Sequence, residues 1–192
     1  MRPNPLSQLT LPIRSPRLLL RLPRLTDVPA LVQLLQDNAV HQWLLHMPYP
    51  YHRMDAVRYL RNSRRRRAAG EQLGLQIARR GDGKILGGLG FSEFNWTHRH
   101  AILGYWLGRP YWGEGFATEA VRAACRAAFT ELNLHRISAY VFHPNPRSMG
   151  VLRKVGFRRE GRAREAFVMR GRWVDDIEFG LLRSELRDER PK

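Results

Sequence analysis

The feature that most constrains how this chain can fold is the stretch YWGEGFATEA, residues 111–120. Gly113 and Gly115 stand one residue apart, after an apolar segment that ends at Leu107 and directly before a run of helix-favouring residues. A strand, a glycine loop and a helix in this order leave several backbone N–H groups unpaired at the start of the helix, where the helix dipole adds positive potential. The stretch therefore predicts an anion site at the turn, to which Thr118 can add a hydroxyl group.

Two familiar phosphate-binding motifs do not fit this turn. A P-loop has the form G-x-x-x-x-G-K-S/T, and no lysine lies here. A dinucleotide fingerprint, G-x-G-x-x-G, requires glycine at the position of Thr118. A glycine pair before a helix also fits an ordinary loop-to-helix turn, so the remainder of the chain must decide between the alternatives.

The pattern along the chain predicts an α+β fold, a mixed sheet covered by helices, in one domain that spans residues 1–192. With 43% hydrophobic residues, a chain of 192 residues can bury one sizeable core. Residues 1–12 are expected to be flexible and 186–192 to form a tail. Strands are predicted near 18–22, 73–77, 85–91, 101–107 and 136–142 and in a terminal hairpin over 167–182 that turns near Gly171; helices are predicted from Thr26, over 53–68, 117–132 and 146–155.

Helical spacing also predicts which side chains face the core. The expected apolar positions of the first two helices are Val28, Leu31, Leu34 and Leu35, then Met54, Val57 and Leu60. In the helix after the glycine turn, the small residues form the inner face, and Glu119, Arg122 and Arg126 fall mostly on the other side.

The net charge is +16, from 33 basic and 17 acidic residues. Such a balance favours contact with nucleic acid or another polyanion. Only Lys84, Lys154 and Lys192 are lysines, so arginine supplies almost all of the excess. A solvated arginine-rich surface is an equally good interpretation, and the run Arg64–Arg67 fits either a solvated helix end or a phosphate contact.

Several functional classes are excluded or disfavoured. The single cysteine, Cys125, allows no internal disulfide and no cysteine metal cluster. No apolar run approaches the ~18 residues of a membrane span, and the first ten residues lack the apolar centre of a signal peptide. A cytoplasmic location without membrane contact is therefore expected.

Two longer stretches now carry a family resemblance: GYWLGRPYWGEGFATEAV, residues 104–121, and HRISAYVFHPNPRSMGVLRKVGFRREG, residues 135–161. They resemble the GNAT superfamily of acetyl-CoA-dependent N-acetyltransferases, and more closely its ribosomal-protein N-terminal acetyltransferases of the alanine type. The similarity extends from SPRLLLR at 15–21 to GRWVDDIEFGLL at 171–182. It implies the GNAT acyltransferase fold, with a mostly antiparallel central sheet flanked by helices, acetyl-CoA as cofactor and no metal.

The resemblance also implies which residues bind the cofactor. The family's pyrophosphate loop, Q/R-x-x-G-x-G/A, falls on residues 112–117, where Trp112 replaces the usual Gln or Arg. Arg153 and Lys154 are expected to reach the nucleotide phosphates or to be simply solvated. The implied cofactor-binding set is Tyr105, Trp106, Leu107, Trp112, Gly113, Glu114, Gly115, Phe116, Ala117, Thr118, Asn145, Ser148 and Arg153.

The implied chemistry is attack of an amine on a thioester, which needs a base for the amine and an acid for the thiolate. Ser148 resembles the serine that this branch places near the thiol, although it also fits an ordinary first-turn serine. Glu165 matches an acidic position of the branch and is the first choice for the base, ahead of Glu93 and Asp175; each also fits a plain surface charge. The carboxylate that the branch often carries before GYW is absent, because Ile102 and Leu103 stand there.

The acceptor implied by the resemblance is a protein N-terminal α-amine, such as that of a ribosomal protein, with direct transfer in a ternary complex. Small-molecule amines, such as polyamines or antibiotics, are the alternative acceptors. A basic RNA- or ribosome-binding protein with a non-catalytic CoA-binding fold is a further alternative, which the net charge motivates. The protein is expected to be a monomer or homodimer.

Overall fold

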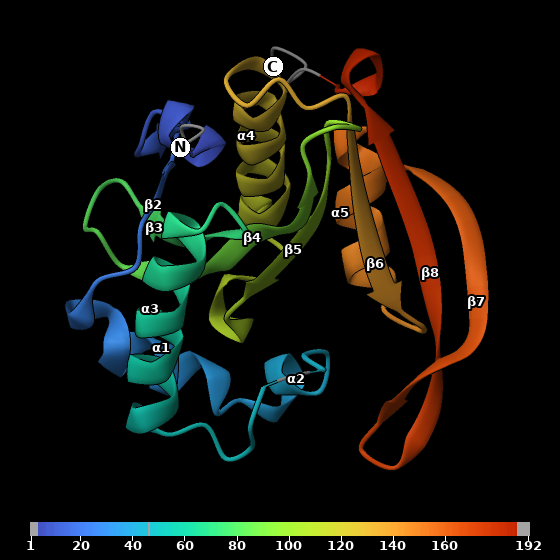
Figure 1. The fold of residues 1–192 in the computed structure, drawn as a ribbon. Coiled ribbons are helices and arrows are strands. Elements are labelled where there is room, and N and C mark those ends of the chain that lie inside the picture. Colours follow the sequence, from blue (N-terminus) through green and yellow to red (C-terminus); the bar gives the residue numbers. More distant parts are fainter. Residues whose placement is uncertain (1–3, 46, 188–192) are drawn as a thin grey trace.

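An eight-stranded sheet organises the molecule, which a computed structural model describes at residues 4–45 and 47–187 (Figure 1). The strand order is β1-β2-β3-β4-β5-β6-β8-β7. Neighbours pair antiparallel except β5 with β6, which are parallel. The strands are β1 (Ile13–Arg14), β2 (Leu18–Arg21), β3 (Gln72–Arg79), β4 (Ile85–Asn95), β5 (His100–Leu107), β6 (Arg136–Phe142), β7 (Arg158–Met169) and β8 (Arg172–Leu182). This mixed, mostly antiparallel sheet confirms the predicted fold class.

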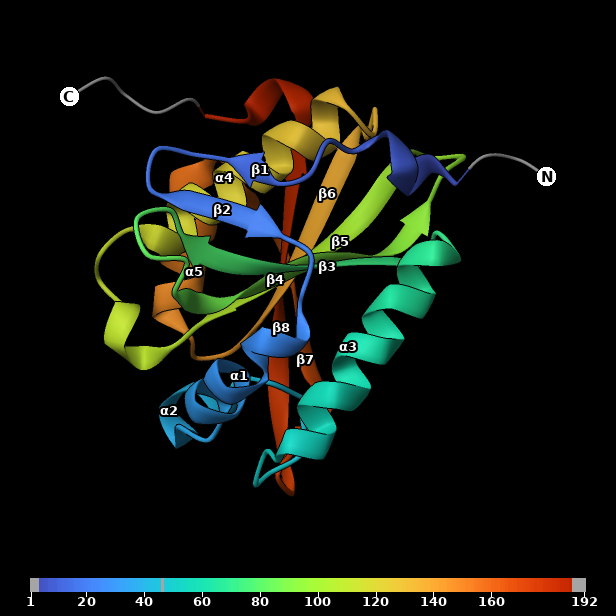
Figure 2. The ribbon, with the colours of Figure 1, turned by 90° about the vertical axis from the view of Figure 1, so that its left-hand side faces the viewer.

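Helices cover both faces of the sheet, as Figures 1 and 2 show. One face carries α4 and α5, which pack on each other, and the opposite face carries α1 and α3. The helices are α1 (Val28–Leu35), α2 (Asn38–His41), α3 (Arg53–Ala68), α4 (Phe116–Thr130) and α5 (Pro146–Val155). Within the described ranges, no helix is long and apolar enough to cross a membrane.

The predicted inner faces are mostly confirmed. Val28, Leu31, Leu34 and Leu35 of α1 are all buried. In α3 the prediction was wrong for Met54, which is 69% exposed; the helix packs through buried Ala56, with Val57, Tyr59 and Leu60 half-buried against the same cluster. The prediction was also wrong for Glu119 of α4, which is buried because three donors from β1–β2 surround its carboxylate.

Three elements had no sequence prediction: β1, α2 and the first half of β7. The side chains of β7 are almost all exposed or half-buried, and its register against β8 shifts between Ala163 and Phe167. An irregular edge strand of this kind lacks the alternation by which strands are recognised. The terminal hairpin is therefore longer than predicted, although its turn does lie at Gly171.

Part of the N-terminal segment, residues 4–12, packs against the main core. A 3-10 turn, Pro5–Gln8, packs against the main core, and Leu6 and Leu9 are buried there. In the expected tail, Leu186 packs against the same core. Residues 1–3 and 188–192 lie outside the described residues.

The separation of β5 from β6 positions the functional site. Their parallel pairing runs from His100↔Arg136 to Leu103↔Ala139, while β5 continues to Leu107 and β6 to Phe142. Over these last residues β6 remains paired with β8. The two strands thus diverge, and the backbone of β5 beyond Leu103 has no partner strand on its β6 side in the described structure.

Candidate functional site

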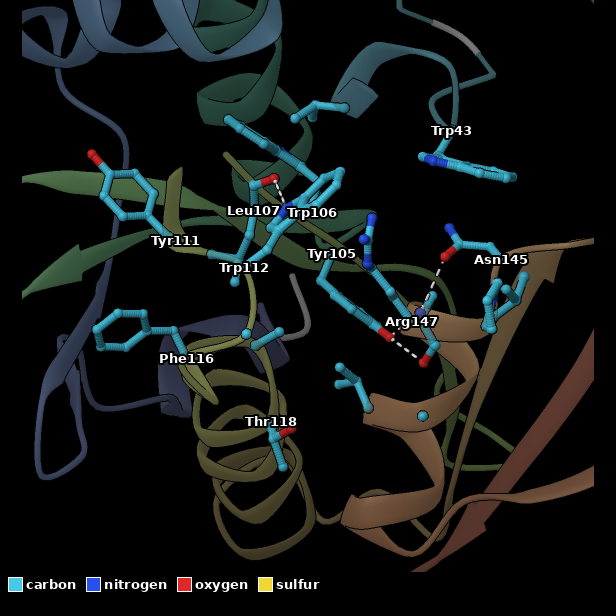
Figure 3. A pocket seen from close by; sticks show the side chains of 18 of the residues that line it. Trp43, Tyr105, Trp106, Leu107, Tyr111, Trp112, Phe116, Thr118, Asn145 and Arg147 are labelled. Atoms are coloured by element: carbon cyan, nitrogen blue, oxygen red, sulfur yellow. Dashed lines mark hydrogen bonds between the residues drawn. The ribbon is translucent and has the colours of Figure 1, made fainter. Parts of the chain in front are cut away.

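A cleft of about 610 Å³ opens where β5 and β6 diverge (Figure 3). Its walls come from the end of β5, the glycine turn, the first turn of α4, the end of β6 and the start of α5, with Trp43 and its neighbours after α2 on the far side. All of the residues predicted to bind the cofactor line this cleft except Glu114 and Arg153. Both Arg153 and Lys154 are exposed on α5, but only Lys154 of the two lines the cleft.

The glycine turn has a backbone that only glycine adopts readily. Gly113 has φ +87° and Gly115 has φ +78°, both in the left-handed region. Gly115 is the N-cap of α4 and offers no side chain to cap it, so the first-turn amides of the helix are free to meet a ligand. A Cβ at Gly115 would meet only Arg17 Nη2, at 3.5 Å. An open turn with uncapped amides suits the approach of phosphate oxygens.

An arginine and a buried glutamate hold this turn in place. Glu119 accepts hydrogen bonds from Ser15 Oγ at 2.8 Å, Arg17 N at 2.8 Å and Arg17 Nε at 2.7 Å. Arg17 Nη1 donates to Glu114 O at 3.0 Å, and its guanidinium lies 4.4 Å from the centre of the Phe116 ring. Burial raises the pKa of Glu119, but the hydrogen bonds from Arg17 and Ser15 outweigh it and leave the pKa lowered. The carboxylate therefore stays charged and ties the turn to the β2 region.

Trp112 occupies the slot where the family motif has Gln or Arg. Its indole Nε1 donates to Leu107 O at 2.8 Å, which fastens the turn to the end of β5 (Figure 3). The guanidinium of Arg147, from α5, lies 4.8 Å from the centre of the indole ring. Arg147 thus places a positive charge at the cleft, next to Trp112, which replaces the Gln or Arg of the motif.

A tyrosine and a serine meet at the other end of the cleft. The Tyr105 hydroxyl lies 2.8 Å from Ser148 Oγ and donates to Ser148 O at 3.0 Å. Asn145 caps α5 by accepting from Ser148 N at 3.1 Å, which orients the first turn of that helix. Burial raises the pKa of Tyr105, so its hydroxyl remains protonated at neutral pH. The family resemblance implied only that Tyr105 binds the cofactor, and nothing in the sequence indicated this side-chain pair.

The predicted carboxylates lie apart from this pair. Glu165 is exposed, with φ +51°, beside a surface hollow that Arg162, Arg164 and Asp175 also line. Asp175 accepts from Glu165 N at 2.8 Å and from Arg162 Nε at 2.6 Å, and these bonds lower its pKa. Glu93 is exposed at the end of β4, also with φ +51°.

Other chemistry is disfavoured at this cleft. Cys125 is fully buried in α4, and burial raises the pKa of its thiol, so it is a poor nucleophile. Among residues 4–45 and 47–187, no three His, Cys, Asp or Glu side chains group as metal ligands would.

Comparisons with known proteins agree with this geometry. The family model described as "Acetyltransferase (GNAT) domain" matches residues 17–158. The chain is 39% identical over 102 residues to a protein described as "Uncharacterized N-acetyltransferase p20" of Bacillus licheniformis, an alignment that covers 53% of this chain and 57% of that protein. It is 35% identical over 95 residues to the ribosomal protein uS5-alanine N-acetyltransferase of Escherichia coli, covering 49% of each. The chain thus spans about half the length of these curated relatives.

A longer alignment links the chain to an enzyme with a different acceptor. The chain is 29% identical over 136 residues to the spermidine N(1)-acetyltransferase of Vibrio cholerae, covering 71% of this chain and 77% of the relative. Among solved structures, Mycobacterium smegmatis RimJ in complex with CoA-disulfide superposes with a TM-score of 0.81 at 27% identity, covering 94% of this chain and 88% of that one.

Proposed function

The chain belongs to the GNAT acetyltransferase family, and from this premise we propose that it transfers acetyl from acetyl-CoA to the N-terminal α-amine of a protein, such as a ribosomal protein, in a ternary complex. One observation carries the proposal: a single cleft joins an uncapped helix N-terminus at one end to a half-buried hydroxyl pair at the other. The first end suits a pyrophosphate, and the second suits a departing thiolate.

The residues present fit acetyl-CoA along the length of the cleft. The amides after Gly115 and the open turn at Gly113 would hold the pyrophosphate, with Thr118 and Lys154 beside it. The backbone of Tyr105–Leu107, which lacks a partner strand on this side in the described structure, would hydrogen-bond the pantetheine arm. When bound, acetyl-CoA supplies the thioester carbonyl that the amine attacks.

Ser148 and Tyr105 would act as the acid. Ser148 Oγ donates a proton toward the sulfur that leaves, and the Tyr105 hydroxyl, 2.8 Å away, replaces that proton. Because the pKa of Tyr105 is raised by burial, the pair starts fully protonated at neutral pH. Glu165 is the predicted base and Glu93 the second choice; both stay predictions.

The acceptor follows from the acidity of amines. An α-amino group has a pKa of about 7.7–8.0 against about 10.4 for lysine, so an α-amine needs less help to become neutral. The E. coli relative, by its name, acts on an alanine of ribosomal protein uS5. We expect peptides that begin with Ala or Ser to be preferred, and the net charge of +16 to aid capture of acidic or RNA-associated partners.

Polyamine acetylation is the second candidate. It is favoured by the spermidine-acetylating relative, which aligns with more of this chain than the uS5 enzyme does. The carboxylates of Asp176 and Glu178, on the β8 strand that flanks β6, supply the negative charge that a polyamine would need.

The experiment compares kcat/KM for three acceptors by thiol release: an Ala-initiated peptide, the same peptide acetylated at its N-terminus but containing an internal lysine, and spermidine. The proposal expects the free α-amine to be used best. The gap of about 2.5 pKa units corresponds to roughly 3.5 kcal/mol at 1.36 kcal/mol per unit. Equal use of the lysine peptide contradicts the α-amine proposal, and a preference for spermidine selects the second candidate.

A further inference from the structure

A buried aspartate with an unsatisfied oxygen lies beside the cleft. Asp176 of β8 is 5% exposed, and its Oδ1 has no hydrogen-bond partner within the described part of the chain. Its pairing partners are Phe142 of β6, which lines the cleft, and Ala163 of β7. A buried carboxylate oxygen without a partner is costly, so such groups in native proteins call for an explanation. A ligand that donates to Asp176 would provide one.

Asp175, the residue before Asp176, lies in a different environment. Asp175 points to the opposite face of β8, because successive residues of a strand alternate. It is satisfied by Arg162 and by the amide of Glu165. Asp176 instead shares a face with Phe142, since directly paired residues lie on the same side of a sheet. The two adjacent aspartates thus differ: Asp175 is ion-paired, whereas Asp176 has a carboxylate oxygen without a hydrogen-bond partner in the described structure.

The surroundings of Asp176 are negative in an otherwise basic protein. Tyr140, which lines the cleft and is 47% exposed, pairs across the strands with Glu178. Burial raises the pKa of Tyr140, and the charges of Glu178, Glu93 and Asp176 raise it further. Arg136, a cation close enough to lower the pKa of Tyr140, is paired with Glu160. The face of β6 and β8 at the mouth of the cleft therefore attracts a cation.

We propose that Asp176, Glu178 and Glu93 form an ammonium subsite for the acceptor, and that Asp176 removes the proton that frees the amine to attack. This inference rests on the proposed acetyltransferase function. One N–H bond of the ammonium breaks and its proton passes to Asp176, which later releases it to solvent. The neutral nitrogen then bonds to the thioester carbon, the carbon–sulfur bond breaks, and Ser148 protonates the sulfur. The second proton of the nitrogen passes to water and, through solvent, restores the proton of the Ser148–Tyr105 pair.

The proton affinity of Asp176 suits this role. Burial raises the pKa of Asp176, and the charge of Glu178 raises it further. Hydrogen bonds from the amides of Val141 and Ile177 lower it, but the net pKa is raised. A carboxylate with a raised pKa is a better match for an α-amine than an ordinary surface carboxylate such as Glu165.

The test compares Asp176→Asn with Asp175→Asn, which removes the same charge one residue away. Each variant is assayed with an Ala-initiated peptide and with the same peptide that begins with 3-fluoroalanine, whose fluorine lowers the pKa of the amine at little cost in size. Asp176→Asn should lower kcat/KM for the Ala peptide by about 10²-fold or more. The ratio of wild-type kcat/KM to that of Asp176→Asn should fall by about tenfold for each unit by which the pKa of the acceptor amine is lowered. Asp175→Asn should affect both peptides alike.

A second variant separates binding from proton transfer. Glu178→Gln should raise KM for the acceptor while largely keeping kcat, because Glu178 attracts the ammonium without taking its proton. Asp176→Asn with wild-type kcat/KM, or with the same loss on both peptides, overturns the assignment. Glu165→Gln, assayed in parallel, should not show the dependence on acceptor pKa; if it alone shows that dependence, the base is Glu165.

The outcome is distinguishable from failure of the proposed function. If wild-type protein acetylates neither peptide, the α-amine proposal fails, and spermidine becomes the probe amine. Calorimetry with spermidine on the CoA-loaded protein should then show weaker binding for Asp176→Asn and Glu178→Gln than for wild type. Equal affinities would overturn the subsite as well.

Discussion

Replacing Glu119 by glutamine should destabilise the protein by a predictable amount. The carboxylate accepts three hydrogen bonds, from Ser15 Oγ, Arg17 N and Arg17 Nε, at 2.7–2.8 Å. Glutamine keeps one oxygen but loses the charge and presents an NH₂ group toward donors. Hydrogen bonds to charged groups contribute about 1.5–3 kcal/mol each. With its oxygen at the Oε1 position, glutamine weakens the bonds from Ser15 Oγ and Arg17 N and loses the bond from Arg17 Nε. Because the Arg17 side chain is 48% exposed, the energies are discounted, and the expected loss is about 2–4 kcal/mol.

The assay is urea unfolding followed by circular dichroism, with thermal unfolding as a second measure. For a chain of this length, 1 kcal/mol shifts Tm by about 2–4 °C, so Tm should fall by roughly 5–15 °C. The matched control is Glu114→Gln, which removes the same charge from an exposed side chain of the same turn. If both variants have the same unfolding free energy, the arginine–glutamate contact does not stabilise the turn and the reasoning is refuted.

The same contact gives the stability a pH dependence with a definite sign. The pKa of Glu119 is lowered in the folded protein, because the bonds from Arg17 and Ser15 outweigh the effect of burial. Its contribution to stability is therefore present above the pKa of an unfolded glutamate, about 4.3, and is lost as the pH falls through the lower folded pKa. The difference in unfolding free energy between wild type and Glu119→Gln should narrow over that acidic range; a constant difference would contradict the assignment.

Three further predictions concern the cleft. Gly115→Val places a β-branched residue at φ +78°, which lowers the free energy of unfolding by about 1–2 kcal/mol and crowds the anion site. Calorimetry should therefore show CoA binding at least tenfold weaker, and unchanged affinity in a folded variant would rule out the turn as the phosphate site. Ser148→Ala should lower kcat by about 10²–10⁴-fold with little change in CoA affinity, and Tyr105→Phe should lower kcat in the same direction, whereas wild-type turnover in both would remove the pair from the chemistry. Asp176→Asn should raise Tm at neutral pH, since the raised pKa of Asp176 means that its charged form disfavours the folded state above that pKa; a lower Tm would indicate an unseen partner.

The sequence predicted those parts of the site that depend on local signals. The turn at Gly113 and Gly115 needs a left-handed backbone, which only glycine adopts without cost, so the residue type reveals the conformation. Asn145 before Pro146 likewise marks the start of α5, which was predicted at 146, and its side chain caps that helix. Both signals lie within a few residues of the structure that they specify.

The contacts that shape the cleft could not be predicted in this way, because they join distant segments. Arg17 and Glu119 are 102 residues apart, and helical spacing alone placed Glu119 toward solvent. Tyr105 and Ser148 are 43 residues apart, on different elements. The helix dipole stabilises an acidic residue in the first turn of α4 whichever way its side chain points. The position of Glu119 in the sequence therefore did not reveal its partner. The packing of α4 and α5 against the sheet brings these pairs together.

The register of the sheet decides which of two adjacent aspartates serves the cleft. β6 leaves β5 after Ala139 but stays paired with β8 as far as Phe142 and Asp176. The strand that forms one wall of the cleft is thus supported from behind by the strand that carries the carboxylates. A shift of one residue in the β6–β8 pairing would move Asp175, with its ion pair to Arg162, onto the cleft face and turn Asp176 away. A one-residue insertion between Glu178 and Phe179, inside the segment of β8 that pairs with β6, should therefore impair turnover far more than CoA binding, because the residues of β5 and α4 proposed to bind CoA lie on other elements.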